Sequence, residues 1–248
     1  MVAGIESFRN KFRDYADCYT VIGSAACDIL MSEENIDFRA TKDIDMILIM
    51  EDRYPEFASV FWDYISEGGY KCGWKNSDKM HFYRFTDPRP GYPVMIELFS
   101  RNPGYNLDTE KRIIPIHIDE DTSSLSAILL DDDFYEFMLE GRTEISNLSV
   151  LKAEYIIPFK MCAWLDLKQK KKAGEHVNDR DYKKHKNDVF RLIPIVDVNS
   201  RIQVRGKVKE AVDDFLNQIA YEAPRPEQLG LEISFAEAMD ALKTIYIR

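Results

Sequence analysis

Short apolar runs separated by polar stretches dominate the first half of the chain, and they predict strands and helices in alternation. Runs rich in β-branched and aromatic residues predict buried strands at 18–22, 43–50, 80–86 and 93–99. A further run, 112–118, predicts an edge strand because it contains Pro115. Helical spacing predicts helices at 5–16, 25–31 and 55–66, with Ser24 as the N-terminal cap of the second.

The second half of the chain changes to helical spacing. Helices are predicted at 152–170, 180–193, 204–220 and 234–245, and Pro158 is expected to start or kink the first of them. Residues 126–139 have no clear pattern. We therefore expect an α+β protein with an α/β half over residues 1–130 and a mainly helical half over residues 131–248.

The composition is typical of a soluble globular protein, with 45% hydrophobic and 31% charged residues among 248. A formal net charge of −10 repels polyanions at long range, which argues against a protein that coats nucleic acid or a membrane surface. Residues 168–191 run against this trend, with nine Lys and Arg against four Asp and Glu. A solvated helix face and a phosphate contact are equal alternatives for this segment.

Cysteine and histidine carry no recognisable metal motif. The four cysteines form no CxxC pair and the four histidines have no i, i+4 spacing, so we expect reduced thiols and no zinc site. The N-terminus lacks the apolar segment of a signal peptide, and no apolar run approaches the roughly 20 residues needed to cross a bilayer. We therefore expect a cytoplasmic protein without a membrane segment.

Asp43 and Asp45 stand at the start of a predicted strand and are the most informative polar residues of the chain. Side chains two residues apart on a strand point to the same face, so the pair can hold a divalent cation between them. Aspartate is unfavourable inside a strand, so two aspartates at this position suggest a specific role. Taken alone, this Asp-x-Asp pattern is more often a polar strand edge than a metal site.

Two further features favour a functional site over a polar strand edge. Gly23 and Ser24 lie between a predicted strand and a predicted helix, where backbone N–H groups and the positive end of the helix dipole can bind phosphate. Glu97 lies within another apolar strand, where a carboxylate is costly unless it is paired or bound to metal. The order of elements therefore predicts three carboxylates on adjacent strands that face the start of one helix.

Residues 22–24 (Ile-Gly-Ser), 43–45 (Asp-Ile-Asp) and Glu97 together resemble the signature of the nucleotidyltransferase superfamily typified by DNA polymerase beta. The resemblance implies a mixed sheet flanked by helices. It also implies that the protein moves NMP from an NTP to an acceptor hydroxyl while pyrophosphate leaves.

Under this resemblance the metal is Mg²⁺, with Mn²⁺ as the alternative, because both prefer hard oxygen ligands. Asp43 and Asp45 would bind the nucleotide's metal. Glu97 would complete a second metal site and accept the proton of the nucleophile. Gly23 and Ser24 would hold the β- and γ-phosphates.

Residues 39–45 (Arg-Ala-Thr-Lys-Asp-Ile-Asp) look most like the AbiEii toxin branch of the superfamily, in which Arg-x-Ser/Thr-x-Asp-x-Asp is typical. That branch also has a helix with a lysine and then a basic helix with an aspartate, matched here by residues 157–163 and 184–192. The resemblance covers residues 18–195. The chain departs from the pattern in its long loop at 32–42 and in the longer spacer between the two later stretches.

The later stretches contribute candidate catalytic and substrate-binding residues. The resemblance implies that Lys160 binds the triphosphate. Its apolar sequence neighbours, taken alone, would equally suit a helix lysine whose stem is buried and whose ammonium group reaches solvent. Lys184, Asp188 and Arg191 share one predicted helix face, where Asp188 is a candidate catalytic acid that orients either Lys184 or Lys160. Asp181 competes with Asp188 as the functional acid.

Arg39 and Thr41 precede the Asp-x-Asp strand and are either phosphate contacts or loop surface. By the resemblance, the acceptor is a tRNA or a protein, and the chain is a toxin with a cognate antitoxin. The alternative function is a catalytically inactive nucleotide-sensing or protein-interaction module on the same fold. A third hypothesis is an unrelated α+β protein in which the motifs are chance.

Overall fold

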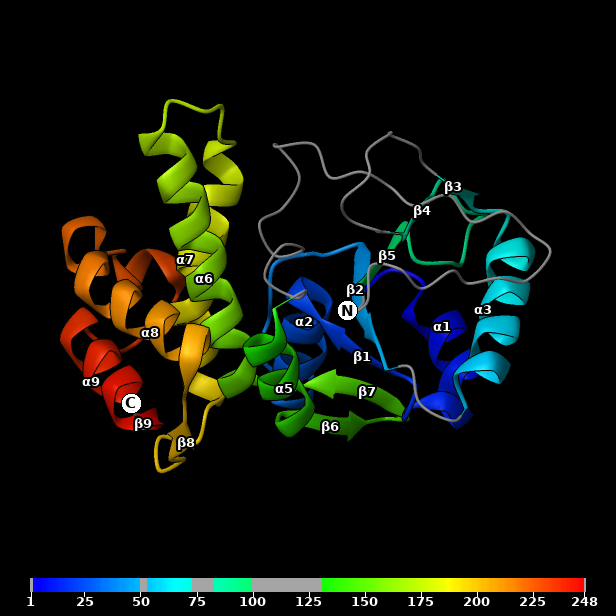
Figure 1. Ribbon diagram of the computed structural model, residues 1–248, viewed down its shortest axis with the longest axis horizontal. Coiled ribbons are helices and arrows are strands. Elements are labelled where there is room, and N and C mark those ends of the chain that lie inside the picture. Colours follow the sequence, from blue (N-terminus) through cyan, green and yellow to red (C-terminus); the bar gives the residue numbers. More distant parts are fainter. Residues whose placement is uncertain (1, 50–52, 73–82, 100–130, 248) are drawn as a thin grey trace. The chain divides into compact units, whose positions relative to one another are not determined.

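The computed structural model describes residues 2–49, 53–72, 83–99 and 131–247, and these form an α+β protein (Figure 1). The described residues fall into two compact units. The first contains the residues up to 99 and also Arg142–Lys152, whereas the second contains residues 131–141 and 153–247. The expected division at residue 130 differs from this arrangement, because a segment beyond it belongs to the first unit.

A mixed sheet forms the centre of the first unit, and its described strands follow the order β3-β4-β5-β2-β1-β7-β6. β1 runs antiparallel to β2, and β2 runs parallel to β5. The expected mixed sheet flanked by helices is therefore confirmed. The strands are β1 (Tyr19–Ile22), β2 (Asp43–Leu48), β3 (Lys71–Cys72), β4 (Tyr83–Thr86), β5 (Met95–Phe99), β6 (Arg142–Ile145) and β7 (Leu148–Leu151).

Three helices accompany this sheet: α1 (Ile5–Phe12), α2 (Gly23–Glu33) and α3 (Tyr54–Gly68), with a short 3-10 turn η1 (Arg13–Tyr15) after α1. Aromatic side chains bind α1 and α3 to the strands. The Phe12 ring centre lies 6.3 Å from that of Tyr19 on β1, and the Phe61 ring centre lies 5.3 Å from that of Phe85 on β4. Each such buried ring contributes roughly 1.5–3 kcal/mol through the apolar surface that it removes from water.

The hairpin β6–β7 is absent from the sequence-based prediction. Its two-residue turn, Ser146 and Asn147, has positive φ angles of 49° and 61°, which is the backbone of a type I′ turn. Glycine usually signals this turn, and here none is present. Arg142 at the start of β6 ties the hairpin to β1, because its Nε donates to Thr20 Oγ1 at 2.9 Å.

The second unit is mainly helical, and the four helices predicted for it are confirmed as α6 to α9. Pro158 lies inside α6 and does not start it. The helices are α5 (Asp132–Glu140), α6 (Ala153–Lys172), α7 (Asp179–Leu192), α8 (Gly206–Gln218) and α9 (Phe235–Ile245). The shorter elements are η2 (Ile193–Ile195), η3 (Ile219–Glu222), η4 (Pro226–Leu229), and the parallel strands β8 (Ile202–Gln203) and β9 (Tyr246–Ile247).

An aromatic cluster holds α6, α7 and α8 together. The Trp164 ring centre lies 5.3 Å from that of Phe215 and 5.9 Å from that of Tyr182. Phe190 completes the cluster, and its ring centre lies 6.4 Å from that of Phe215. Because these rings come from three helices, the second unit has its own core.

Several predictions can be compared with the structure only in part. The edge strand predicted at 112–118 lies outside the described residues, and so does the beginning of the unassigned region 126–139, whose later part forms α5. Cys18, Cys27 and Cys162 are free thiols. No described helix combines the length and the apolar character that a membrane span requires.

Candidate functional site

The turn between β1 and α2 is built on a glycine. Gly23 has a φ angle of +66°, a left-handed conformation that residues with a side chain rarely adopt. Ile22, the residue before it, is the register partner of Asp45 across the antiparallel pair of β1 and β2. A Cβ atom on Gly23 would lie 2.3 Å from Asp45 Oδ2, so the carboxylate occupies the space that a side chain would need.

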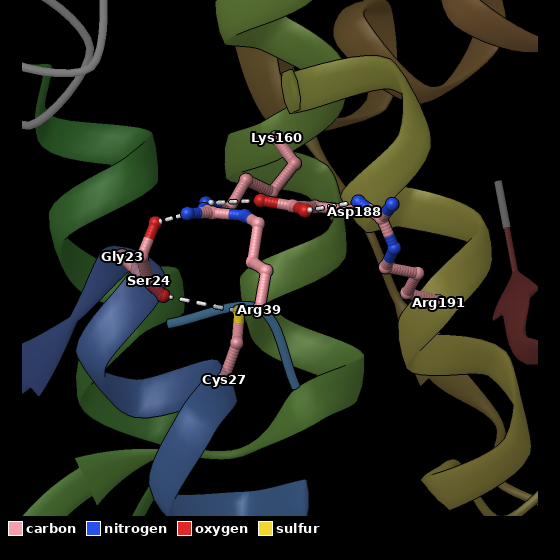
Figure 2. A network of polar contacts seen from close by, with 7 residues as sticks. All are labelled: Gly23, Ser24, Cys27, Arg39, Lys160, Asp188 and Arg191. Atoms are coloured by element: carbon pink, nitrogen blue, oxygen red, sulfur yellow. Dashed lines mark hydrogen bonds and ion pairs between the residues drawn. The ribbon is translucent and has the colours of Figure 1, made fainter. Parts of the chain in front are cut away.

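Ser24 does not cap α2 as predicted, because the helix begins one residue earlier, at Gly23. The N-cap residue is Ile22, whose side chain makes no capping hydrogen bond. Ser24 is buried, and its Oγ accepts a hydrogen bond from Arg39 Nη2 (Figure 2). The predicted phosphate contact Arg39 therefore lies beside the start of α2.

The start of α2 has the properties of an anion site. Its first turn contains no acidic residue, and its N-cap residue, Ile22, makes no side-chain capping hydrogen bond. The helix dipole adds a partial positive charge, and the Arg39 guanidinium adds a full one. Together these features favour a phosphate group at this position.

The two aspartates of β2 and Glu97 of β5 share one face of the sheet. Asp45 and Glu97 are register partners in the parallel pair β2–β5. Asp43, Asp45 and Glu97 are each half-buried, whereas the intervening Ile44 and Ile96 are buried. This alternation places the carboxylates on the more exposed face and the isoleucines in the core.

Glu97 is held by an arginine that the sequence analysis missed. Arg84 on β4 is the register partner of Glu97, and its Nε and Nη2 both contact Glu97 Oε1. Among the described residues, no group of three Asp, Glu, His or Cys side chains lies close enough to hold a metal ion as they stand. The three carboxylates thus share one face of adjacent strands, and one of them, Glu97, is paired with Arg84.

The remaining carboxylates still fit a single hard cation. Asp43 and Asp45 are two residues apart on β2, half-buried and on the same face. Their oxygen donors are of the kind that Mg²⁺ and Mn²⁺ prefer. Asp43 and Asp45 are therefore the residues of this strand that could hold such a cation.

Thr41 and Asp28 are two further polar residues of the first unit. Thr41 is half-buried and lies two residues before the start of β2. The carbonyl of the next residue, Lys42, accepts a hydrogen bond from the Val94 N–H at 3.0 Å, which extends the pairing of β2 and β5. Asp28 lies four residues after Ser24 on α2 and is only 2% exposed. A carboxylate inside the apolar run at 25–31 was a visible signal that the sequence analysis passed over.

The candidate residues of the second unit form their own network. Lys160 on α6 and Asp188 on α7 are both buried, and Lys160 Nζ donates to Asp188 Oδ2 at 3.2 Å (Figure 2). Arg191 Nη1 reaches the other oxygen of Asp188 at 3.3 Å. Of the predicted alternatives for Asp188, the pairing with Lys160 is therefore present, and it joins two packed helices.

The other two candidates on α7 differ in burial from Asp188. Lys184 is half-buried, and Asp181 is half-buried near the start of the helix. Asp188 is fully buried and bonded to two cations. Of the two competing acids, only Asp188 is part of the ion-pair network described above.

No protein-family model matches the chain, and no curated protein matches it. Among solved structures, the chain is similar to an antigenic nucleotidyltransferase-like protein from Paracoccidioides brasiliensis, with 16% sequence identity and a TM-score of 0.49. The match covers 96% of this chain and 90% of that chain. A likeness this distant assigns no activity, so the functional assignment depends on the residues of the first unit.

Proposed function

We propose that the protein is a metal-dependent nucleotidyltransferase whose first unit binds the NTP. The proposal depends chiefly on one observation: the β1–α2 turn packs directly on the Asp-x-Asp strand. Gly23 lies against Asp45, and Asp45 is in register with Glu97. A helix start that favours phosphate and carboxylates that favour a cation therefore lie side by side, as a metal nucleotide requires.

The polyphosphate would bind at the start of α2. Backbone N–H groups of the first turn donate to phosphate oxygens, and Arg39, bonded to Ser24, neutralises their charge. Gly23 serves this contact because its left-handed backbone, which residues with a side chain rarely adopt, turns β1 directly into α2. Arg39 and Ser24 thus act in binding and orientation.

Asp43 and Asp45 would hold Mg²⁺, or Mn²⁺ in its place, and the cation would screen the charge of the triphosphate. The acceptor hydroxyl oxygen would bond to the α-phosphorus as the bond from that phosphorus to the pyrophosphate oxygen breaks. The hydroxyl proton would leave to a base or to water. Glu97, paired with Arg84, would have a positioning role beside Asp45 and would not itself bind the cation.

The acceptor and the biological role are proposed from the sequence resemblance alone. The motif at residues 39–45 supports an AbiEii-like enzyme with a tRNA or a protein as acceptor and a cognate antitoxin as partner. The buried ion pair of Lys160 and Asp188 supports a structural role for both residues inside the second unit. We therefore do not include them among the groups that contact the nucleotide.

Calorimetric titration with Mg²⁺ and each NTP tests the proposal through Asp45→Asn. We expect the variant to bind the metal nucleotide at least about tenfold more weakly, because it loses a charged ligand worth about 1.4 kcal/mol or more. Asp63→Asn, an exposed position on α3, is the matched control and should bind as the unchanged protein does. Equal binding by Asp45→Asn would show that the metal assignment is wrong.

The ion pair of Arg84 and Glu97 favours a second candidate, an inactive nucleotide-sensing or protein-interaction module on the same fold. An arginine at the third carboxylate competes with a cation for that carboxylate, which would retain nucleotide binding and reduce turnover. Prolonged incubation of the Mg²⁺–NTP complex with acceptor candidates distinguishes the two. A stable complex that releases no pyrophosphate supports the inactive module.

A further inference from the structure

A cavity of about 330 Å³ opens on the second unit, and none of its lining residues belongs to the proposed nucleotide site. Lysine dominates its lining, which combines the last turns of α6 with α7 and η3. The lining residues are Lys168, Lys171, Lys172, Tyr182 and Glu222. Four of the five lining side chains thus carry a cationic or hydroxyl donor.

Glu222 is the carboxylate at the centre of these donors. Its Oε2 accepts from Tyr182 Oη at 2.6 Å, and its Oε1 lies 3.2 Å from Lys168 Nζ. Its backbone carbonyl accepts from Lys186 Nζ at 2.8 Å. The Glu222 carboxylate therefore accepts from one ammonium group and one phenol, donors that a bound phosphate could also receive.

Negative charge in the cavity falls short of the positive charge. Lys168, Lys171, Lys172 and Lys186 meet only two carboxylates, those of Glu222 and of Asp179, which pairs with Lys171 at 2.9 Å. Among the described residues, Lys172 makes no ion pair and is exposed. Burial lowers the pKa of Lys186, the Glu222 carboxylate opposes this shift, and the nearby Lys183 and Lys168 add to it.

The lysines are held in place by rings and not only by carboxylates. Lys168 Nζ lies 4.5 Å from the centre of the Trp164 ring, and Lys171 Nζ lies 5.2 Å from the centre of the Tyr182 ring. Both rings belong to the rigid aromatic core, so the ammonium groups lose little freedom when they bind a ligand. Tyr221, which precedes Glu222 in the sequence, is 87% exposed.

We infer that this cavity is a second anion site, which binds a phosphate group, and that Glu222 takes the place of that phosphate when none is bound. A dianionic phosphate would offset the surplus of positive charge and, once the Glu222 carboxylate has moved aside, would receive donors from Lys168, Lys172 and Tyr182. The phosphate belongs either to a free phosphate compound or to a nucleic acid whose base stacks on Tyr221. The site is independent of the proposed nucleotide site.

Titration with inorganic phosphate, followed by phosphorus NMR on the full chain, tests the inference. All proteins carry Arg39→Ala, which removes the side-chain charge at the start of α2 and leaves any remaining binding there the same in every variant compared. Lys168→Met and Lys172→Met should each weaken binding by about tenfold, because each removes one charged donor. Lys243→Met, an exposed lysine on α9 in the same unit, is the control and should bind as the background does.

Glu222→Gln separates a phosphate site from a purely structural cluster. Removal of the competing carboxylate should tighten phosphate binding several-fold, whereas Lys168→Met weakens it. Lys172 makes no ion pair in the described structure, so its variant tests the site without a risk to folding. Binding that is unchanged by both lysine variants, or weakened by Glu222→Gln, would overturn the inference.

The same titration with a short 5′-phosphorylated RNA in place of inorganic phosphate identifies the source of the phosphate. If inorganic phosphate binds, a free phosphate compound suffices. If only the RNA binds and the same lysine variants weaken it, the phosphate belongs to a nucleic acid. If neither binds, the inference is wrong, and Asp45→Asn still tests the proposed function separately.

Discussion

Asp45 occupies the space that a side chain on Gly23 would fill. The Oδ2 atom of Asp45 lies 2.3 Å from the position of a Cβ on Gly23, and the left-handed backbone of Gly23 turns the chain directly into α2. Glycine at this position thus allows the left-handed turn and also leaves room for the Asp45 carboxylate. The phosphate-favouring helix start and the cation-favouring strand are joined at this contact.

Gly23→Ala should destabilise the protein more than a left-handed backbone alone explains. The backbone accounts for about 1–2 kcal/mol, and the displacement of Asp45 adds to it. Gly91→Ala is the matched control, because Gly91 also has a positive φ, of +94°, but has no atom within 4 Å of its Cβ position. Urea denaturation measures both, and equal losses would show that the Asp45 contact costs nothing.

Arg84→Met should raise the affinity for Mn²⁺. The substitution removes the cation that holds Glu97 and leaves this carboxylate beside Asp45 on the same face. We expect Mn²⁺, followed by electron paramagnetic resonance, to bind about three- to tenfold more tightly. Arg89→Met, an exposed arginine of the same unit, should leave the affinity unchanged. Unchanged or weaker binding by Arg84→Met would place the metal away from Glu97.

Lys160→Met should destabilise the second unit by about 3–5 kcal/mol, because it leaves Asp188 buried with only part of its charge compensated. The double variant Lys160→Met with Asp188→Leu should recover most of this loss, since no buried charge then remains. Lys209→Met breaks a surface pair with Asp213 and should cost less than about 1 kcal/mol. Urea denaturation gives all three values. A loss for Lys160→Met no larger than that for Lys209→Met would contradict the role assigned to this pair.

The stability should fall as the pH rises above 9, and Cys162 should contribute to the fall. Burial raises the pKa of this thiol from its usual 9.0 to about 12. Between these values the unfolded chain releases a proton that the folded chain keeps, so the free energy of unfolding decreases with pH; below 9 the contribution is constant. Cys162→Ala should therefore show a shallower decrease. Buried tyrosines add to the slope in both proteins, and identical slopes would contradict the prediction.

The fold of the first unit follows from the sequence where apolar runs are long. The runs at 18–22 and 43–50 predict β1 and β2, and helical spacing predicts α1 and α3, because burial of one face is the dominant force on these segments. The hairpin β6–β7 was not predictable in the same way. Its turn has no glycine, and its backbone conformation depends on the strands that it joins.

The sequence predicts which residues form the candidate site, but it does not predict which of their side chains form ion pairs. The residues Gly23, Asp43, Asp45 and Glu97 stand out because polar or flexible residues interrupt apolar runs. That Arg84 would face Glu97 depends on strand register between β4 and β5, which no local pattern specifies. The ion pair of Lys160 and Asp188 depends likewise on how two helices pack.

Nucleotide transfer in the presence of acceptors tests the central claim most directly. The protein is incubated with Mg²⁺, α-labelled NTPs and a cell lysate that supplies RNA and protein, and both label transfer and pyrophosphate are measured. We predict label in a macromolecule with an equal amount of pyrophosphate, a loss of at least about a hundredfold for Asp45→Asn, and no loss for Asp63→Asn. Transfer by Asp45→Asn at the same rate as by the unchanged protein, or no transfer with any nucleotide, would contradict the claim.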